Sequence, residues 1–450
     1  MNQLTLLLLG LYAVVLVLLS RGGSGTGVGW LLDGRRLTLP AFVATLVTTW
    51  YGGILGVGEY AWRWGISTWL VFGLPYYLAA VLFALVLAPR LRRTEAISIP
   101  ELLSRTYGRR TAVLGAGGVW ALSVPAAYVL MLAVLLRQVT GWPLWVAAVA
   151  GAAFSALYVG LSGFRAVVRT DALQLVLMYG GFLVLLPAAL HEAGGLQAMW
   201  RALPPAHRSW DGGLGLQAVL VWYLIALQTM VEPAFYQRVF AARSPRVART
   251  GVLVSVGAWA VFDFLTTFSG LAARVLLPDL ADPLAAYPAL AARVLPAALG
   301  ALFTLGLFAT VMSSLDSYLF LAAATVGHDL AATPPAPGAE RRASRWGLVV
   351  SAALAVAAAL AFGSVVTLWH HVGSVVTSAL LLPVLSVHLP PRWRYGGGSA
   401  AWAIVLAAAT AAAWILAGRA GAYPLGLEPM FPALAVSIAC WLAGRGARTA

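Results

Sequence analysis

Long apolar segments follow one another along the whole chain, and this succession is the feature that most restricts its fold. A hydrocarbon layer about 30 Å thick requires roughly 20 mainly apolar residues to cross as a helix. Inside hydrocarbon, every backbone polar group needs a partner within its own segment, which favours helices. We therefore predict an all-α polytopic membrane protein. Its thirteen predicted transmembrane helices lie near residues 3–20, 40–62, 66–89, 112–136, 143–161, 171–192, 214–236, 250–277, 294–327, 346–365, 368–389, 399–418 and 425–444.

The composition excludes several other classes of protein. Apolar residues make up 61% of the 450 residues and charged residues only 10%, which excludes an ordinary soluble domain and a disordered chain. The formal net charge is +14, but the basic residues lie in short loops between apolar segments, so we expect no nucleic-acid partner. Because Cys440 is the single cysteine, no intramolecular disulfide or cysteine-based metal site is expected.

The distribution of arginine predicts the orientation in the membrane. Placing the N-terminus outside and the C-terminus in the cytoplasm leaves most arginines on the cytoplasmic side, as the positive-inside rule requires. The first segment lacks a basic leader and a cleavage motif, so we expect it to be retained as a span. The predicted location is the cytoplasmic (inner) membrane. The arginines expected outside are Arg63, Arg137, Arg201, Arg208, Arg274, Arg293 and Arg419.

Two predicted spans contain residues that interrupt helices. The second span holds Gly52 and Gly53 near its middle, and the seventh holds Glu232 and Pro233. Transporters often have helices broken at matching positions of two halves. Because these two spans are five apart, five-helix units that begin at each of them would cross the membrane in opposite directions. The alternative is that the glycines only pack closely and the proline only kinks its helix.

This spacing predicts a single transport domain over residues 1–450, built on a 5+5 inverted repeat. The first repeat would cover residues 38–192 and the second residues 214–389. Residues 1–37 and 390–450 would then supply one extra N-terminal and two extra C-terminal helices.

Carboxylates and hydroxyls lie where hydrocarbon is expected. Ionisable groups at membrane depth are costly unless they face protein, an ion or water, which marks Asp171 and Asp316 as functional candidates. Thr310, Ser313, Ser314 and Ser317 recur at helical spacing and share one face. Such oxygens are the donors that a hard cation prefers. The alternative is that the hydroxyls bond back to their own helix and aid packing.

Solute contacts are expected from the interrupted helices at the membrane midplane. By position the candidates are Thr48, Trp50, Tyr51, Trp222 and Gln228. Aromatic rings here can stack on a solute or close a gate, although the same rings also fill ordinary helix packing.

Four segments carry a resemblance to a known family. They are SIPELLSRTYGRR at 98–110, SGFRAVVRTDALQ at 162–174, YQRVFAARSPRVARTG at 236–251 and the segment 286–317 that ends in LFATVMSSLDS. In this order and on this topology, the chain resembles the sodium:solute symporter family over roughly residues 35–390. The resemblance implies a LeuT-like inverted-repeat fold and uptake of a small organic solute coupled to inward sodium flow.

The resemblance also implies a sodium site between the second and ninth spans. Its ligands would be the backbone carbonyls of Leu46, Thr49 and Thr310 and the hydroxyls of Ser313 and Ser314.

Asp171 matches the family's sixth-span aspartate, which lies toward the inner side and influences ion binding or release. Some members hold a second sodium with this aspartate and hydroxyls one turn beyond the serine pair, where this chain has Asp316 and Ser317. Two neighbouring carboxylates seldom both ionise, so the pair would either strengthen an ion site or hold a proton.

Other charged residues receive simpler interpretations. Glu59 and Arg63, four residues apart, are predicted to form an ion pair within one helix. Asp263 lies within the eighth span but matches no motif of the family. The arginines between residues 236 and 249, Arg238 among them, are interpreted as part of a cytoplasmic loop.

The predicted function is a sodium-driven symporter that works by alternating access, with Na⁺ as its coupling ion and the solute and lipid bilayer as its other partners. The alternatives are a proton-coupled transporter that uses Asp171 and Asp316, and a solute sensor on the same fold. Sensors usually carry added signalling domains, whereas this chain ends at Ala450, soon after its last apolar segment. We expect no enzyme, because no nucleophile with a base, metal cluster or phosphate loop is present. Nothing indicates an obligate protein partner.

Overall fold

The computed structural model describes residues 3–21, 28–330, 339–396, 398–418 and 423–445. The described residues are almost entirely helical and contain no β-strand beyond two isolated bridges. The longer helices are α1 (Gln3–Leu19), α3 (Leu39–Trp50), α4 (Ile54–Trp64), α5 (Leu74–Leu82), α7 (Ile99–Tyr107), α8 (Arg109–Ser123), α9 (Ala126–Thr140), α10 (Leu144–Ser162), α11 (Phe164–Glu192), α14 (Leu216–Ala226), α15 (Pro233–Ala241), α16 (Pro245–Leu276), α17 (Ala286–Val294), α18 (Ala297–Ala324), α19 (Ala339–Phe362), α20 (Val365–Ser386), α21 (Ser399–Ala417) and α22 (Met430–Gly444). The shorter helices are α2 (Val28–Leu32), α6 (Ala88–Arg93), α12 (Leu196–Ala202) and α13 (Pro205–Arg208).

Ten helical segments of the described chain are long and apolar enough to cross a membrane. They are Leu39–Trp64, Trp69–Arg93, Arg109–Thr140, Phe164–Glu192, Leu216–Ala241, Pro245–Leu276, Ala297–Asp329, Arg342–Phe362, Val365–Ser386 and Ser399–Ala417. The three remaining predicted spans correspond to the shorter apolar helices α1, α10 and α22. The all-α membrane class is therefore confirmed, whereas the number of crossings stays a prediction.

The span predicted at residues 112–136 differs from the structure, because it is divided into α8 and α9. Val124 is extended (φ −67°, ψ 114°), and Pro125 follows it. Proline disfavours helical geometry in the residue before it and has no N–H to continue the hydrogen-bond ladder. The helix therefore breaks at this point.

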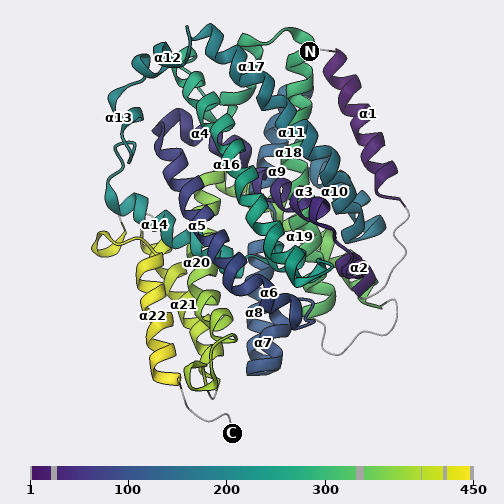
Figure 1. Cartoon of the computed structure of the whole chain (residues 1–450), viewed down its shortest axis with the longest axis vertical. Coiled ribbons are helices and arrows are strands. Elements are labelled where there is room, and N and C mark those ends of the chain that lie inside the picture. Colours follow the sequence, from purple (N-terminus) through teal and green to yellow (C-terminus); the bar gives the residue numbers. More distant parts are fainter. Residues whose placement is uncertain (1–2, 22–27, 331–338, 397, 419–422, 446–450) are drawn as a thin grey trace.

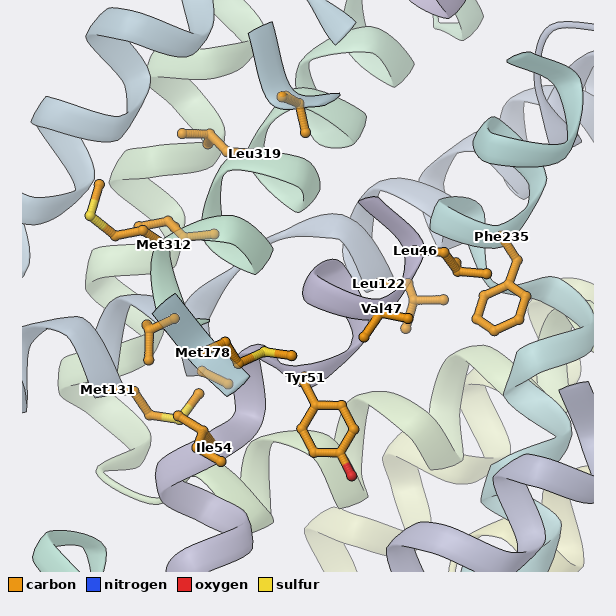
Figure 2. Packing of buried hydrophobic residues seen from close by; sticks show 14 of the residues in the cluster. Leu46, Val47, Tyr51, Ile54, Leu122, Met131, Met178, Phe235, Met312 and Leu319 are labelled. Carbon is orange, nitrogen blue, oxygen red and sulfur yellow. The ribbon is translucent and has the colours of Figure 1, made fainter. Parts of the chain in front are cut away.

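The first interrupted helix consists of α3, a 3₁₀ turn over Tyr51–Gly53, and α4. Glycine is required in this turn because other helices approach it closely. A Cβ atom at Gly52 would overlap the side chain of Ser314 on α18, and one at Gly53 would overlap the ring of Trp369 on α20. Figure 2 shows Tyr51 and Ile54 of this segment among buried side chains from other helices. The turn thus lets α18 and α20 touch the backbone itself.

The second interrupted helix consists of α14, a 3₁₀ turn over Leu227–Val231, and α15. Between them Glu232 is extended (φ −72°, ψ 113°), and its carboxylate accepts hydrogen bonds from Gln228 (3.0 Å) and from the backbone N–H of Ala234 (3.5 Å). Pro233 at the first position of α15 needs no hydrogen-bond partner there. Both helices expected to be interrupted are therefore interrupted.

Helix α3 packs against α11, α16 and α18, and α11 also packs against both α16 and α18. In Figure 1 the labels of α3, α11 and α18 lie close together near the middle of the bundle, with α1 at one edge and α21 and α22 at another. Large apolar side chains of α1 such as Leu7 and Leu11 are exposed, whereas the polar side chains at residues 310–317 of α18 are fully buried, namely Thr310, Ser313, Ser314, Asp316 and Ser317. This arrangement suits a protein surrounded by hydrocarbon, and it places the polar residues at the centre.

Candidate functional site

Three helices meet at the carboxylate of Asp171 on α11, which is fully buried. One of its oxygens accepts a 2.6 Å hydrogen bond from the hydroxyl of Ser313 on α18, and the other accepts one from the hydroxyl of Thr45 on α3. The sequence placed Asp171 and Ser313 in different predicted spans as site candidates, and the structure brings them into direct contact.

The neighbouring serine, Ser314, reaches the interrupted helix instead. Its hydroxyl donates to the backbone carbonyls of Thr49 (2.5 Å) and Thr48 (3.2 Å), just before the 3₁₀ turn. Thr49 and Ser317 also meet, with 2.8 Å between their hydroxyl oxygens. Oxygens from α3, α11 and α18 therefore gather in one place. We use the name oxygen cluster for the Asp171 carboxylate, the backbone carbonyls of Thr48 and Thr49, and the hydroxyls of Thr45, Thr49, Ser313, Ser314 and Ser317.

A buried arginine corrects one prediction. Arg238, interpreted from sequence as part of a cytoplasmic loop, is fully buried on α15. Helix α15 continues to Ala241, so the loop begins later than the arginine-rich sequence indicates. The Arg238 guanidinium lies 5.1 Å from the centre of the Phe164 ring, which shields it from solvent and adds a cation–π contact.

Arg238 is the cation of the oxygen cluster in this structure. Its Nη2 atom donates to the hydroxyls of Thr49 and Ser317, both at 2.7 Å, and to Thr45 at 3.0 Å. The same nitrogen lies 3.9 Å from the Asp171 carboxylate. A buried charge requires this kind of compensation, because burying a lone ion costs several kcal/mol.

The donor set of the oxygen cluster suits a hard monovalent cation. It offers hydroxyl, carbonyl and carboxylate oxygens without thiol or imidazole, and such oxygens are what alkali and alkaline-earth ions prefer. The cluster holds one carboxylate, so one bound cation would neutralise it. Within the described residues, no group of three or more His, Cys, Asp or Glu side chains is arranged to hold a metal ion, and a transition-metal site is not indicated there.

Two predicted carbonyl ligands lie farther into their helices. Leu46 is inside α3, where its carbonyl takes part in the regular helical ladder, and Thr310 is inside α18, where its hydroxyl bonds to the carbonyl of Gly306 at 2.7 Å. Neither residue has a described hydrogen bond to the oxygen cluster. Their roles as ligands stay predictions.

Asp316 points to different partners from those expected. Its carboxylate accepts hydrogen bonds from the hydroxyls of Ser155 and Tyr158 on α10. The neighbouring Ser317 faces Thr49 and Arg238, as described above, because successive residues of a helix point about 100° apart. Among the described contacts, no hydrogen bond or ion pair joins Asp316 to Asp171 or to Ser317. The predicted second site is thus divided between two faces of α18.

A cavity of about 150 Å³ lies beside the 3₁₀ turn of the first interrupted helix. Four of the five predicted solute residues line it, namely Trp50, Tyr51, Trp222 and Gln228. Thr48 is not among the lining residues, and its hydroxyl donates to the carbonyl of Ala44 at 2.9 Å within α3. The interrupted helices therefore contribute to the cavity wall, and contact of these residues with a solute stays a prediction.

The sequence did not identify several residues of this wall. Asp263 on α16 lines the cavity and accepts hydrogen bonds from the hydroxyls of Tyr51 and Tyr77. Its position within an apolar span was a usable signal, since a carboxylate at membrane depth marks a candidate site. Trp259 and Trp369 also line the cavity, but tryptophan is common throughout this chain, so nothing distinguished them.

The chain is similar in sequence to known sodium-coupled transporters. The chain is 26% identical over 272 residues to human sodium-coupled monocarboxylate transporter 1, a match that covers 56% of the chain and 43% of that protein. It is 25% identical over 253 residues to the sodium/pantothenate symporter of Escherichia coli (strain K12), covering 53% of the chain and 52% of that protein. The chain thus spans about half the length of these curated relatives.

A solved structure has the same fold. A sodium-coupled sialic acid symporter in a substrate-bound outward-open state superposes with a TM-score of 0.79 at 17% identity, covering 98% of this chain and 96% of that one. The model of the sodium:solute symporter family matches residues 30–392, a region that contains both interrupted helices, the oxygen cluster and the cavity. The chain therefore belongs to the sodium:solute symporter family.

Proposed function

We propose that this protein is a sodium-coupled symporter that imports a small organic solute by alternating access. The main support for this proposal is that one short segment, residues 48–51, contributes both to the oxygen cluster and to the cavity wall. The carbonyls of Thr48 and Thr49 meet Ser314 in the oxygen cluster, and the next two residues, Trp50 and Tyr51, line the cavity.

Family membership and the relatives support this function. The matched proteins are named as sodium-coupled transporters of monocarboxylates and pantothenate, and the structural neighbour as a sodium-coupled sialic acid symporter. All three are transporters rather than enzymes. Because the curated matches cover only part of those proteins, the activity of this chain is inferred from its own site together with this likeness.

The shared segment provides a means of coupling. A sodium ion held by Ser313, Ser314 and Asp171 would fix the end of α3, and with it the rings of Trp50 and Tyr51 at the cavity. By linkage, a solute that fixes the same rings raises the affinity for sodium by the same factor. Inward movement of one charge across 100 mV supplies about 2.3 kcal/mol, which is enough to drive useful accumulation.

Arg238 occupies the proposed sodium site when no ion is bound. Its guanidinium already satisfies the hydroxyls of Thr45, Thr49 and Ser317 and lies near Asp171. Sodium entering the oxygen cluster competes with Arg238 for the same oxygens. The arginine thereby stabilises the ion-free state of the site, and ion binding requires the guanidinium to give up part of these contacts.

A second candidate is proton coupling, which Asp316 favours. Its carboxylate is fully buried and, within the described residues, has hydroxyl partners but no cation partner. A proton would neutralise it. Uptake that follows a pH gradient and is indifferent to sodium would support this alternative over sodium coupling.

The proposed architecture is a single transport domain over residues 1–450 with thirteen transmembrane helices. Residues 38–192 and 214–389 form inverted repeats, and residues 1–37 and 390–450 add peripheral helices. The chain crosses the cytoplasmic (inner) membrane, with its N-terminus outside the cell and its C-terminus in the cytoplasm.

This topology is tested by labelling of introduced cysteines. In a Cys440→Ser background, R208C should react with an impermeant thiol reagent from outside and R246C only from inside. Both arginines are exposed. Labelling of both positions from one side would contradict this topology.

The function itself is tested by uptake into proteoliposomes containing the purified chain. Labelled glucose, lactate, proline and choline are offered with an inward sodium gradient, and with an equal potassium gradient as the control. The proposal predicts accumulation of at least one of them only with sodium. Equal accumulation with both cations would contradict it.

A further inference from the structure

An acidic side chain, Asp263, lies on the wall of the cavity. Asp263 lies near the middle of the 32-residue helix α16 and is only 5% exposed. Its two carboxylate oxygens accept hydrogen bonds from the hydroxyls of Tyr51 and Tyr77, which also line the cavity. These bonds orient the carboxyl group toward the cavity, and a cation bound beside it would favour its ionised form. Within the described residues, no ion pair joins Asp263 to a basic side chain.

A second carboxylate lies directly behind the same wall. Gln228 lines the cavity and donates a 3.0 Å hydrogen bond to Glu232, which is fully buried at the break between α14 and α15. Arg238 lies six residues farther along the chain on α15, and its guanidinium is engaged by the oxygen cluster. One acidic group thus lines the cavity, and a second is hydrogen-bonded to a residue of its lining.

No basic side chain is found among the described residues that line the cavity. An anionic solute would meet Asp263 without a compensating charge, which is unfavourable in a poorly solvated site. A cationic solute would instead find an oriented carboxylate. The wall therefore favours a cationic solute over an anionic one.

Aromatic rings complete the wall. Trp50 contacts Trp259 and Tyr76, with ring centres 5.9 Å and 5.3 Å apart, and all three rings line the cavity. On another side, Phe72 packs against Trp222 and Trp369 in the same way. Tryptophan and tyrosine faces attract organic cations, most strongly where water is excluded. An acidic group among such rings is a combination that recognises ammonium compounds.

We propose that the transported solute is a small organic cation whose ammonium group is held between the Asp263 carboxylate and the aromatic rings around it. This inference rests on the proposed function, because it names the solute class of the same cavity. It differs from the monocarboxylate, pantothenate and sialic acid named for the relatives. It also assigns a binding role to Tyr77, which orients the carboxylate from α5.

The first test compares solutes that have the same shape and a different charge. Binding to the purified full-length chain in sodium chloride is measured by calorimetry for choline, tetramethylammonium and ethanolamine. The uncharged carbon analogue 3,3-dimethylbutan-1-ol is the matched control for choline, and propionate and glucose represent anions and sugars. At least one ammonium compound should bind, and choline should bind at least tenfold more tightly than its analogue. Equal affinities for that pair would overturn the proposal, as would binding of propionate or glucose without any ammonium compound.

The second test uses Asp263→Asn, which keeps the size of the side chain and removes its charge. Affinity for the ammonium compound should fall at least tenfold, and Asp263→Glu should recover part of it. Asp279→Asn is the control, because it removes one acidic charge from an exposed position just beyond α16. Unchanged affinity in Asp263→Asn, or the same loss in Asp279→Asn, would overturn the proposal.

A sodium titration without solute distinguishes failure of the proposed solute class from failure of the proposed sodium-coupled function. If sodium raises the melting temperature of the unmodified chain but no ammonium compound binds selectively, the solute class is wrong and the sodium site stands. If sodium has no effect beyond that of potassium, the proposed function itself fails. The Asp263→Asn protein should retain the sodium-dependent shift, which would also show that it is folded.

Discussion

The hydroxyl of Ser313 donates a 2.6 Å hydrogen bond to the carboxylate of Asp171, and this contact joins α18 to α11 at the buried centre of the protein. The adjacent Ser314 turns to the carbonyl end of α3. Two successive serines therefore connect one helix to two others. An ion bound here would contact oxygens of three helices, so its binding would depend on how these helices are placed relative to one another.

The buried pair of Arg238 and Asp171 predicts a stability effect that sodium should reduce. Replacing Arg238 with glutamine leaves Asp171 without its cation, and breaking a buried ion pair costs about 3–5 kcal/mol. We expect R238Q to melt at a lower temperature in potassium chloride and to be stabilised by sodium chloride more strongly than the unmodified chain. The measurement is thermal unfolding in each salt.

Two further variants control this experiment. R243Q removes an exposed arginine just after α15 and should leave both melting temperatures unchanged. The double variant D171N/R238Q removes both charges and should regain part of the stability lost in R238Q, because the two effects are coupled. Additive losses in the double variant would show that the pair does not act as a unit.

The 3₁₀ turn of the first interrupted helix predicts a steric effect at Gly52. A Cβ atom there would overlap the Ser314 side chain, so G52A must displace either α18 or the turn. Overpacking of this kind costs about 1–3 kcal/mol, and we expect uptake to be lost even where the protein still inserts. Uptake and expression are measured together. The control is G180A on α11, where an added Cβ meets no atom within 4 Å. Normal uptake by G52A would contradict the close approach.

Replacing Asp316 or Asp171 with asparagine is predicted to change the sodium affinity of the protein to different extents. Asp316 bonds to Ser155 and Tyr158 of α10 and lies outside the oxygen cluster, so D316N should keep sodium-dependent uptake with less than about a threefold change in sodium affinity. D171N removes the charge that faces the bound ion and should weaken sodium affinity more than tenfold, or about 1.4 kcal/mol. The sodium concentration for half-maximal uptake is the readout. Loss of uptake in D316N, together with proton-driven uptake by the unmodified chain, would instead favour proton coupling.

Much of the fold follows from local sequence signals. Apolar length predicted the spans, and the glycines at 52 and 53 and the Glu232–Pro233 pair predicted the two breaks, since these residues act through backbone geometry within a few positions. The ion pair of Glu59 and Arg63, four residues apart, is also present at 3.0 Å. The division of the span at Pro125 was missed because its flanking sequence is as apolar as that of an unbroken helix.

The site was predicted less completely, because its contacts join distant parts of the chain. Ser313 and Asp171 were identified, but the position of Arg238 depends on where α15 ends in space, and its sequence resembles an ordinary cytoplasmic loop. Asp316 and Ser317 are neighbours in sequence, yet helix geometry turns them to different partners. Asp263 could be identified as a candidate from its position within an apolar span. Its hydrogen-bond partners, Tyr51 and Tyr77, are distant in sequence and could not be predicted.

The binding of radioactive sodium to the purified protein tests the central claim most directly. Ser313→Ala combined with Ser314→Ala removes two hydroxyls of the oxygen cluster, and Ser378→Ala is the control, because its described hydrogen bonds go to carbonyls of its own helix α20. We predict that the double variant binds sodium at least tenfold more weakly while its melting temperature in potassium chloride changes little, and that Ser378→Ala binds sodium normally. Unchanged sodium affinity in the folded double variant would contradict a sodium site at α3, α11 and α18.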